Sequence, residues 1–325
     1  MFKLNPGDLL LYLSRAALET LDIATADVVA RIDKLFKGCA AGSVWNASKR
    51  GIALGDGRYV MNTLSLADNP PYAAVKALGL NPANKTRGFD SIGGLVVVLD
   101  SVSGRPLAIM DGNWLTAIRT AGLSAVAATY LAKDDASTMA FIGCGIQARS
   151  HLDAFADLYP LREVRAFGRG AANRDRLCAL ARDKGIEAIA SASAQEAVDG
   201  ADIIVSAVSA GPSLEPFLDA GWLSAGAFAA ITDLHGPWRA ETFPAFDRII
   251  IDDLEQDRVA ARRLIDPGLV TGDFTGLVCG DVPVRRNRKE RIAFAFRGLA
   301  LGDLALASLA YEAALKAGVG LELDR

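Results

Sequence analysis

A glycine-rich turn in the middle of the chain constrains the fold more than any other feature. The turn follows the apolar segment 139–142, precedes a stretch with helical spacing, and reads Gly143-Cys144-Gly145-Ile146-Gln147-Ala148. Glycine at 143 permits a sharp turn, glycine at 145 lets a phosphate approach the backbone, and a small residue at 148 lets the helix pack on the strand. A helix that begins here presents free N–H groups to an anion. The pattern predicts a binding site for the pyrophosphate of a dinucleotide.

The segment around this turn alternates between short apolar strands and helices. Strands are expected at 137–143, 163–168, 188–190, 203–207, 227–231 and 248–252, and helices at 113–132, 147–157, 173–184 and 194–198. Apolar strands joined by helices are typical of a parallel, doubly wound sheet that is covered on both faces. The predicted fold class is therefore α/β, with a Rossmann-type domain over residues 116–299.

The flanking segments have other patterns. Residues 9–38 carry apolar side chains at helical spacing, whereas residues 43–111 hold short β-rich runs separated by Gly, Asn, Asp and Pro. An Ala- and Leu-rich helix is expected over 297–317. These segments predict a smaller α+β domain over residues 1–115, completed by the C-terminal helix at about 300–325.

Composition limits the classes of partner. The chain has 325 residues, 51% of them hydrophobic, which suits two domains with large cores. The formal net charge is -3, without the basic excess of a nucleic-acid-binding protein. The one dense basic run, at 285–291, is interpreted as a solvated loop and the start of a helix.

Cysteine usage and the N-terminal sequence bear on metal binding and location. The four cysteines form no CxxC pair and the chain has only two histidines, so no metal site of Cys/His type is expected. Scattered cysteines favour a reducing compartment. The first residues lack the pattern of a signal peptide, and no segment approaches the ~20 apolar residues of a membrane span. We therefore expect a cytoplasmic protein that does not enter a membrane.

The end of the second strand bears on the choice between NAD and NADP. An acidic residue there would bind the ribose 2′-OH of NAD, but the segment 166–170 contains none. Arg169 stands at this point and could face a 2′-phosphate. NADP is therefore the predicted cofactor. NAD stays an alternative, because Arg169 could instead cover the adenine of either dinucleotide.

Motifs on both sides of the glycine turn resemble those of the ornithine cyclodeaminase/μ-crystallin family, and the likeness extends over most of the chain. They are Lys76 with Asn81 and Arg87-Gly88, then Gly93-Gly94-Leu95-Val96-Val97, Arg119-Thr120-Ala121-Gly122, the GxGxQA turn itself, and Gly302-Asp303-Leu304-Ala305. The resemblance implies a bound nicotinamide, a homodimer, and reaction at the carbon–nitrogen bond of a small imino or amino acid. It also implies that the smaller domain binds the substrate and forms the dimer.

The resemblance assigns substrate-binding roles to several residues. It implies that Arg119 and Lys76 hold the substrate carboxylate, which suits a planar, permanently charged guanidinium. A buried lysine could also polarise an imine or carry a proton. A third basic residue is expected in the first β segment, where Arg50, or Lys49 beside it, is the nearest candidate. Ser91 stands where the family often has a threonine near the substrate.

The expected acid/base loop departs from the family pattern. The family usually has an aspartate two residues before a proline. Matching Pro237 and Glu241 without gaps puts His235 at that position, with Asp233 where glycine is usual. Histidine titrates near neutrality, and either side chain could donate the proton. Trp238 could line the pocket and favour a substrate other than ornithine.

Other cofactor contacts are expected outside the glycine turn. The candidates are Thr120, Ala207 and Val208 after the strand 203–207, and Asp303 in the terminal helix. Asp303 would orient the nicotinamide region or serve only as a carboxylate at a helix end.

Together these features predict an NAD(P)-dependent oxidoreductase that transfers hydride between the nicotinamide and the α-carbon of an imino or amino acid. The reaction would be of the ketimine reductase or amino-acid dehydrogenase type. Three alternatives stay open: a redox-neutral ornithine- or lysine-type cyclodeaminase that releases ammonia, a hydroxyproline-type dehydratase, and a non-catalytic binder of NADPH and a small ligand. The missing aspartate counts against the cyclodeaminase.

Overall fold

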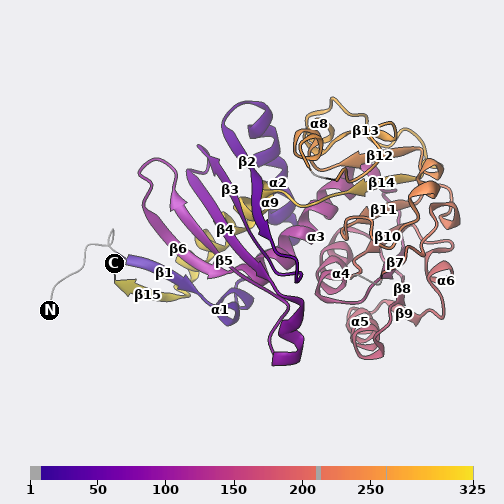
Figure 1. The fold of residues 1–325 in the computed structure, drawn as a ribbon, viewed down its shortest axis with the longest axis horizontal. Helices are drawn as coiled ribbons and strands as arrows, with labels where there is room; N and C mark the ends of the chain where they lie inside the picture. Colours follow the sequence, from indigo (N-terminus) through magenta and orange to yellow (C-terminus); the bar gives the residue numbers. More distant parts are fainter. Residues whose placement is uncertain (1–8, 210–213, 261, 325) are drawn as a thin grey trace. The chain divides into compact units, whose positions relative to one another are not determined.

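The computed structural model describes residues 9–209, 214–260 and 262–324, which form two compact units (Figure 1). The first unit holds the described residues up to Arg119 and those from Leu299 onward, and the second runs from Thr120 to Gly298. The boundary falls inside the Ala-rich helix α3 (Gly112–Leu131). No helix in the described part of the chain is long and apolar enough to cross a membrane.

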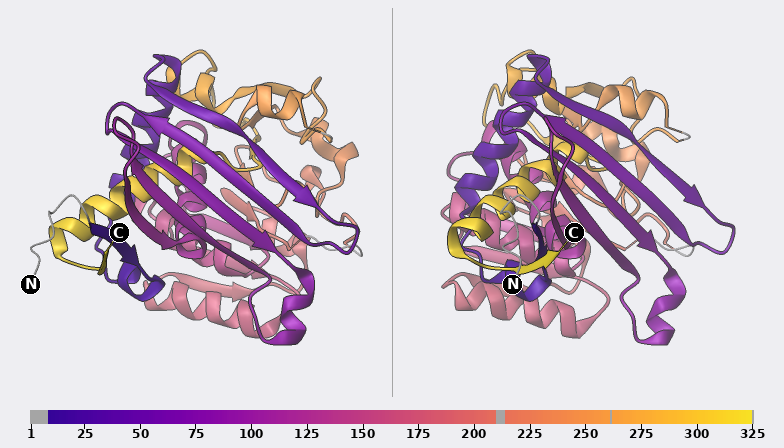
Figure 2. Two further views of the ribbon diagram at one scale, coloured as in Figure 1. Left: turned by 60° about the vertical axis from the view of Figure 1, so that its left-hand side comes forward. Right: turned by 90° about the vertical axis from the view of Figure 1, so that its left-hand side faces the viewer.

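A seven-stranded sheet is the framework of the first unit, in the order β15-β1-β6-β5-β4-β3-β2. Neighbouring strands are antiparallel, except that β1 and β6 are parallel. Helices α2 and α9 pack against each other and on one face of the sheet (Figure 2). The elements are β1 (Leu9–Leu13), α1 (Arg15–Glu19), α2 (Thr25–Ala40), β2 (Val44–Ala53), β3 (Tyr59–Ala67), β4 (Tyr72–Leu80), the 3₁₀ helix η2 (Pro82–Arg87), β5 (Ile92–Asp100), β6 (Pro106–Asp111), α9 (Ala300–Ala317) and β15 (Leu321–Asp324).

The two faces of this sheet differ in burial. Successive side chains of a strand point to opposite faces. In β5, Val96 and Val98 are fully buried, whereas Leu95 between the glycines and Val96 is 49% exposed. One face therefore packs on the helices, and the other is open.

An eight-stranded parallel sheet is the framework of the second unit, in the order β13-β12-β14-β11-β10-β7-β8-β9. The chain adds β8 and β9 on one side of β7 and then crosses to β10 on the other, so the strand order reverses between β7 and β10. This arrangement confirms the predicted Rossmann-type fold class. The elements are β7 (Thr138–Ile142), α4 (Ile146–Leu158), β8 (Glu163–Phe167), α5 (Ala171–Asp183), β9 (Glu187–Ala190), α6 (Ala194–Val198), β10 (Ile203–Ser206), η3 (Ala220–Trp222), β11 (Phe228–Ile231), η4 (Ala240–Ala245), β12 (Arg248–Ile251), α7 (Leu254–Arg258), β13 (Val270–Asp273), α8 (Phe274–Cys279) and β14 (Ile292–Ala295).

Three expectations about local structure are wrong. Leu9–Leu13 is strand β1 and not the start of a helix, because it pairs with β6 and β15. The spacing of apolar residues in so short a run does not distinguish a strand from a helix. The basic run 285–291 precedes a strand, β14, and not a helix. The strands expected from the sequence also lack β13 and β14, although β14 lies between β11 and β12 and is fully buried.

Candidate active site

A buried ionic cluster in the first unit joins three residues that are far apart in the sequence. The register pairs Thr63 of β3 with Lys76 of β4, so both side chains lie on the sheet face that α9 covers. Asp303 of α9 accepts a hydrogen bond from Lys76 Nζ (2.7 Å) at Oδ1 and from Thr63 Oγ1 (2.8 Å) at Oδ2. Arg119 Nε lies 3.0 Å from Asp303 Oδ1. Lys76 and Asp303 are each 1% exposed and Arg119 is 8% exposed.

The charges of this cluster shift the pKa values of its members. Burial, together with the charge of Arg119, lowers the pKa of Lys76 to about 8, against the opposing effect of Asp303. Burial alone would raise the pKa of Asp303, but the charges of Lys76 and Arg119 outweigh it and lower the pKa. Near pH 7 two cations and one carboxylate leave a net charge of +1 in a buried place. A single additional carboxylate would neutralise that charge.

The other predicted substrate residues lie outside this cluster. Arg50 of β2 is exposed and pairs with Asn62, the neighbour of Thr63, so it lies on the opposite face of the sheet from Lys76. Ser91 precedes β5, whereas Lys76 pairs with Val96 farther along that strand. The Ser91 hydroxyl is buried and has no hydrogen-bond partner among the described residues. The structure therefore brings together Lys76 and Arg119, but neither Arg50 nor Ser91.

The glycine turn of the second unit has the geometry that dinucleotide binding requires. Gly143 has φ +93°, and a Cβ there would lie 2.5 Å from the carbonyl oxygen of Ala207, so only glycine fits. Gly145 caps the N-terminus of α4, and a Cβ added to it would meet nothing within 4 Å. Ala148 is fully buried, so the helix packs closely on the sheet. The open space at Gly145 leaves the N-terminus of α4 accessible to an anion.

The remaining residues predicted to contact the cofactor are placed as follows. The Gln147 Oε1 atom is buried and has no partner among the described residues, and Ile146 is 41% exposed at the start of α4. Arg169 is exposed just after β8, and Thr120 is buried where the second unit begins. Asp303 is held by the cations of the first unit. Its contact with a cofactor stays a prediction.

The loop after β11 carries the two acid/base candidates. Asp233 accepts hydrogen bonds from Ser206 Oγ (3.1 Å) and from the N–H of Val208 (3.0 Å), both at the end of β10. Burial raises the pKa of this carboxyl to about 6, although both hydrogen bonds oppose the rise. Leu234 and His235 both have φ +55°, a conformation that is costly for residues other than glycine.

His235 differs from Asp233 in having an uncommitted polar atom. Its ring Nδ1 is buried without a hydrogen-bond partner among the described residues, and the ring lies edge-on to Phe243. Burial, and then the positive charge of Arg262, lower the pKa of the imidazole. The ring is therefore neutral near pH 7 and could accept or relay a proton.

Trp238 belongs to the core and does not line a pocket, contrary to the expectation from the sequence. The side chain is 1% exposed and packs among Phe243 and Phe246. Its indole N–H donates to Ser206 Oγ at 2.9 Å, and Ser206 in turn donates to Asp233. Sequence reasoning missed Ser206 and Thr63, because only strand register shows that they face Asp233 and Asp303.

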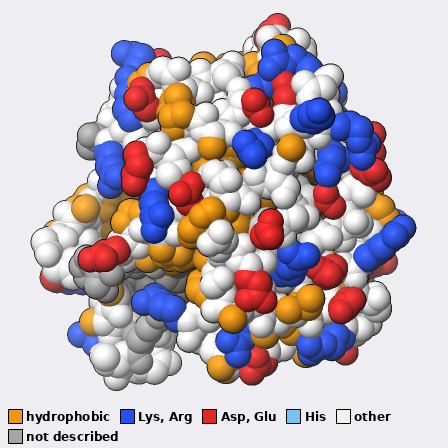
Figure 3. All heavy atoms as spheres, turned by 90° about the vertical axis from the view of Figure 1, so that its right-hand side faces the viewer, with side chains coloured by type: hydrophobic (Ala, Val, Ile, Leu, Met, Phe, Trp, Pro, Cys, Tyr) orange, Lys and Arg blue, Asp and Glu red, His pale blue; other side chains and the backbone are white. Residues whose placement is uncertain are grey.

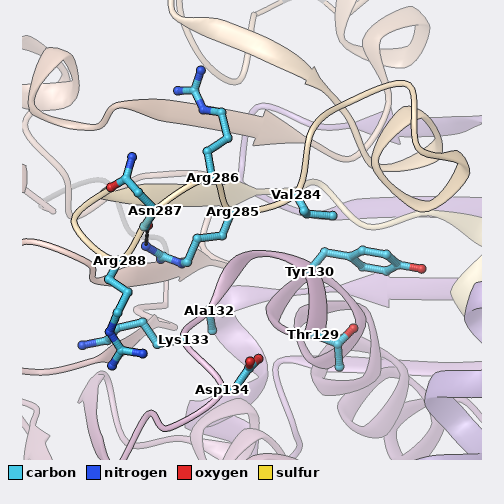
Figure 4. Close-up of a pocket in the computed structure, with 10 residues that line it drawn as sticks. All are labelled: Thr129, Tyr130, Ala132, Lys133, Asp134, Val284, Arg285, Arg286, Asn287 and Arg288. Atoms are coloured by element: carbon cyan, nitrogen blue, oxygen red, sulfur yellow. Dashed lines mark hydrogen bonds between the residues drawn. The ribbon is translucent and has the colours of Figure 1, made fainter.

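A separate pocket of about 420 Å³ lies between the end of α3 and the loop 284–288 (Figure 4). Its four cations are all bound within the protein: Arg285 to the carbonyl of Leu131, Arg286 to Glu290, Arg288 to Asp135, and Lys133 to Asp202. These bonds hold the basic loop against the rest of the second unit. On the face shown in Figure 3, acidic and basic side chains are interspersed, in keeping with the balanced composition.

Comparison with known proteins supports the motif assignment. Residues 14–318 match the model of the ornithine cyclodeaminase/mu-crystallin family. The chain belongs to this family. An alanine dehydrogenase of Archaeoglobus fulgidus is 29% identical over 262 residues, which are 78% of this chain and 80% of the relative.

Solved structures of relatives agree over nearly the whole chain. The Δ1-pyrroline-2-carboxylate reductase of Thermococcus litoralis, in complex with NADH and L-proline, has a TM-score of 0.88 and 27% identity, and the match covers 97% of this chain and 100% of that one. An archaeal alanine dehydrogenase dimer with bound NAD has a TM-score of 0.86 and 25% identity, with 97% and 99% covered. These family members are nicotinamide-dependent enzymes of amino- and imino-acid metabolism.

Proposed function

We propose that the chain is an NAD(P)-dependent oxidoreductase that reduces a small imino acid, or oxidises the corresponding amino acid. The observation that carries this proposal is the buried cluster of Lys76, Arg119 and Asp303, whose net charge of +1 suits one substrate carboxylate. The glycine turn in the same chain supports a dinucleotide as cofactor. Relatives named as reductases and dehydrogenases act on substrates of this class.

The cluster suggests a division of roles in the first unit. Arg119 and Lys76 bind the carboxylate, and Asp303 holds both cations in place. Lys76, with a pKa of about 8, is mostly protonated at neutral pH and can also donate a proton to an imine or amine nitrogen. The first unit thus serves as the substrate domain, and the second as the cofactor domain.

Residues of the second unit hold the cofactor and a further proton carrier. Gly143, Gly145 and the N-terminus of α4 bind the pyrophosphate, and the bound nicotinamide supplies or accepts the hydride. Arg169, exposed after β8, favours NADP, whereas the two solved relatives bind NADH and NAD. We assign proton relay to His235, because both oxygens of Asp233 already accept hydrogen bonds.

A cofactor-oxidation screen tests this function. Purified protein is mixed with NADPH or NADH and with Δ1-pyrroline-2-carboxylate, Δ1-piperideine-2-carboxylate, or pyruvate plus ammonia or methylamine, and absorbance at the nicotinamide band is followed. We expect oxidation of the cofactor with at least one carboxylated imine. The matched control is Δ1-pyrroline, which lacks the carboxylate and should react at least about a hundredfold more slowly, because the charged cluster has no partner to bind.

Other outcomes identify the alternatives. Formation of proline or pipecolate with ammonia from ornithine or lysine, without net cofactor oxidation, would establish a cyclodeaminase. Loss of water from a hydroxyproline would establish a dehydratase. Cofactor binding without turnover of any of these substrates would contradict the oxidoreductase and leave a binding protein.

The open face of the first sheet supports a homodimer. Its exposed apolar side chains come from five strands, and the strand register puts them on the face opposite Lys76: Tyr12, Trp45, Ile52, Val60, Leu64, Leu95 and Leu321. An apolar face of this extent is typical of a protein interface. A relative is an archaeal alanine dehydrogenase dimer. The occupant we propose is a second copy of this chain.

Replacing Leu64 by glutamate should convert the dimer to a monomer. Leu64 is 46% exposed on the open face, where a buried unpaired carboxylate would strongly disfavour association. The measurement is molar mass by light scattering after size exclusion. Leu315→Glu is the matched control, because Leu315 is 57% exposed on α9, on the other side of the sheet, and should leave the mass unchanged. A monomeric wild type, or a dimeric Leu64→Glu variant, would contradict this interface.

A further inference from the structure

The carboxyl group of Asp233 lies where the two halves of the Rossmann sheet meet. It follows β11 and binds the N–H of Val208, which follows β10. That same nitrogen lies 3.2 Å from the position of a Cβ on Gly143, so the end of β10 touches the phosphate-binding turn. In this fold the second half of the sheet binds the nicotinamide half of the dinucleotide, outside the carboxyl ends of its strands.

The hydrogen bonds of Asp233 fix this carboxyl group in place. Trp238, in the aromatic core, donates to Ser206, and Ser206 donates to one carboxylate oxygen while Val208 donates to the other. Asp233 is half-buried as a whole residue, whereas Ser206 is fully buried. The chain thus has an acid that three hydrogen bonds hold at the carboxyl ends of β10 and β11.

Few other charges act on this acid. Burial raises its pKa most, and hydrogen bonds from Val208, Ser206 and the loop backbone oppose the rise. The titratable neighbour in the loop is His235, and the cations that act on His235 are Arg262 and Arg297. Within 9–209, 214–260 and 262–324, no ion pair neutralises a negative charge on the Asp233 carboxylate.

We propose that Asp233 sets the preference of this site for the oxidation state of the nicotinamide. The oxidised ring carries one positive charge and the reduced ring carries none, whereas the phosphates are the same in both. An ionised carboxylate at the ends of β10 and β11 attracts the oxidised ring and leaves the reduced ring unaffected. The carboxylate repels the phosphates of both forms equally. The ratio of Kd for the oxidised form to Kd for the reduced form therefore reports only the effect on the ring. The inference rests on the proposed use of a nicotinamide cofactor.

The pH dependence of this ratio follows from the titration of the carboxyl. Asp233 is neutral well below pH 6 and ionised well above it, because burial raises its pKa to about 6. Raising the pH from 5 to 8 should therefore lower the ratio of Kd for the oxidised form to Kd for the reduced form, by about tenfold.

The experiment measures both dissociation constants by calorimetry or fluorescence, without substrate, in the full-length protein from pH 5 to 8. Asp233→Asn is the main variant, because its amide can accept from Val208 and donate to Ser206 while it removes the charge. Its ratio should not change with pH and should equal that of wild type at pH 5. Asp199→Asn is the control, since this exposed aspartate precedes the opposite end of β10 and should follow wild type. Asp233→Ala tests the same point should the asparagine variant be unstable.

The possible outcomes test the role of Asp233 and the proposed use of a nicotinamide cofactor separately. A ratio in wild type that is independent of pH would overturn the role of Asp233. A pH dependence that persists in Asp233→Asn would do the same and would locate the charge on His235, whose protonation repels the oxidised ring. If the protein binds neither oxidation state of NAD or NADP, the proposed function itself fails.

Discussion

Replacing Lys76 by methionine is expected to lower kcat with the carboxylated imine by about a thousandfold, within the range for a group that transfers a proton in the transition state. Lys76 is 1% exposed and bound to Asp303, and burial lowers its pKa to about 8. Methionine keeps the length of the apolar stem and removes the ammonium group. Steady-state kinetics at pH 7, with a thermal melt of the same sample, measure the effect.

A second variant separates the two roles of Lys76. If Lys76 donates the proton, the wild-type rate of reduction falls as pH rises through about 8, because the protonated form is lost there. Lys76→Arg retains a permanent cation, so its KM should be close to that of wild type while its kcat stays low. Its rate should not fall as the pH rises through about 8. Lys34→Met, on the exposed side of α2, is the control. A Lys76→Met variant with kcat within threefold of wild type would refute the catalytic role.

Replacing Gly145 by valine should raise Kd for the dinucleotide by about a hundredfold or more while the protein stays folded. Gly145 has φ -78°, which valine can adopt, and a Cβ there meets no atom of the protein within 4 Å. The added side chain would fill the open space where the pyrophosphate approaches the helix. Binding of NADPH and NADH by calorimetry gives the change in Kd.

The next helix in the chain provides a matched control for this variant. Gly170 is also an N-cap glycine with a negative φ and open space around its Cβ, so Gly170→Val has the same cost in helix capping. It should weaken binding far less than Gly145→Val. Equal losses in the two variants would contradict blocked access at Gly145 as the cause, because helix capping or the neighbouring Arg169 would then account for the weaker binding. Gly143 is unsuitable, because a Cβ there collides with Ala207.

The cofactor turn could be predicted from the sequence because its determinants are consecutive in the chain. A buried strand, two glycines and a helix start follow one another from residue 138 to residue 148, and each has a local conformational cause. The alternation of apolar strands and helices likewise predicted the parallel sheet. In both cases the relevant interactions join residues that are near in sequence, so periodicity and glycine placement carry the information.

The charged cluster required a different kind of information. The family resemblance pointed to Lys76 and Arg119, but the residues themselves did not show that Asp303 binds both, nor that Thr63 completes the set. These contacts depend on the register of β3 and β4 and on the helix that returns over the sheet after residue 299. Arg50 was placed with Lys76 and Arg119 because of its position in the chain. The pairing of β2 with β3 puts Arg50 on the face of the sheet opposite Lys76.

The sequence by itself determined the fold class, the dinucleotide turn and the family. The tertiary structure alone decided that Leu9–Leu13 is a strand, that β14 lies inside the second sheet, and that Trp238 is a core residue holding Ser206. The physical reason is the range of the interactions. Turn geometry and helix propensity act over a few neighbouring residues. Strand pairing, burial and the pKa of a buried group depend instead on residues that only the folded chain brings together.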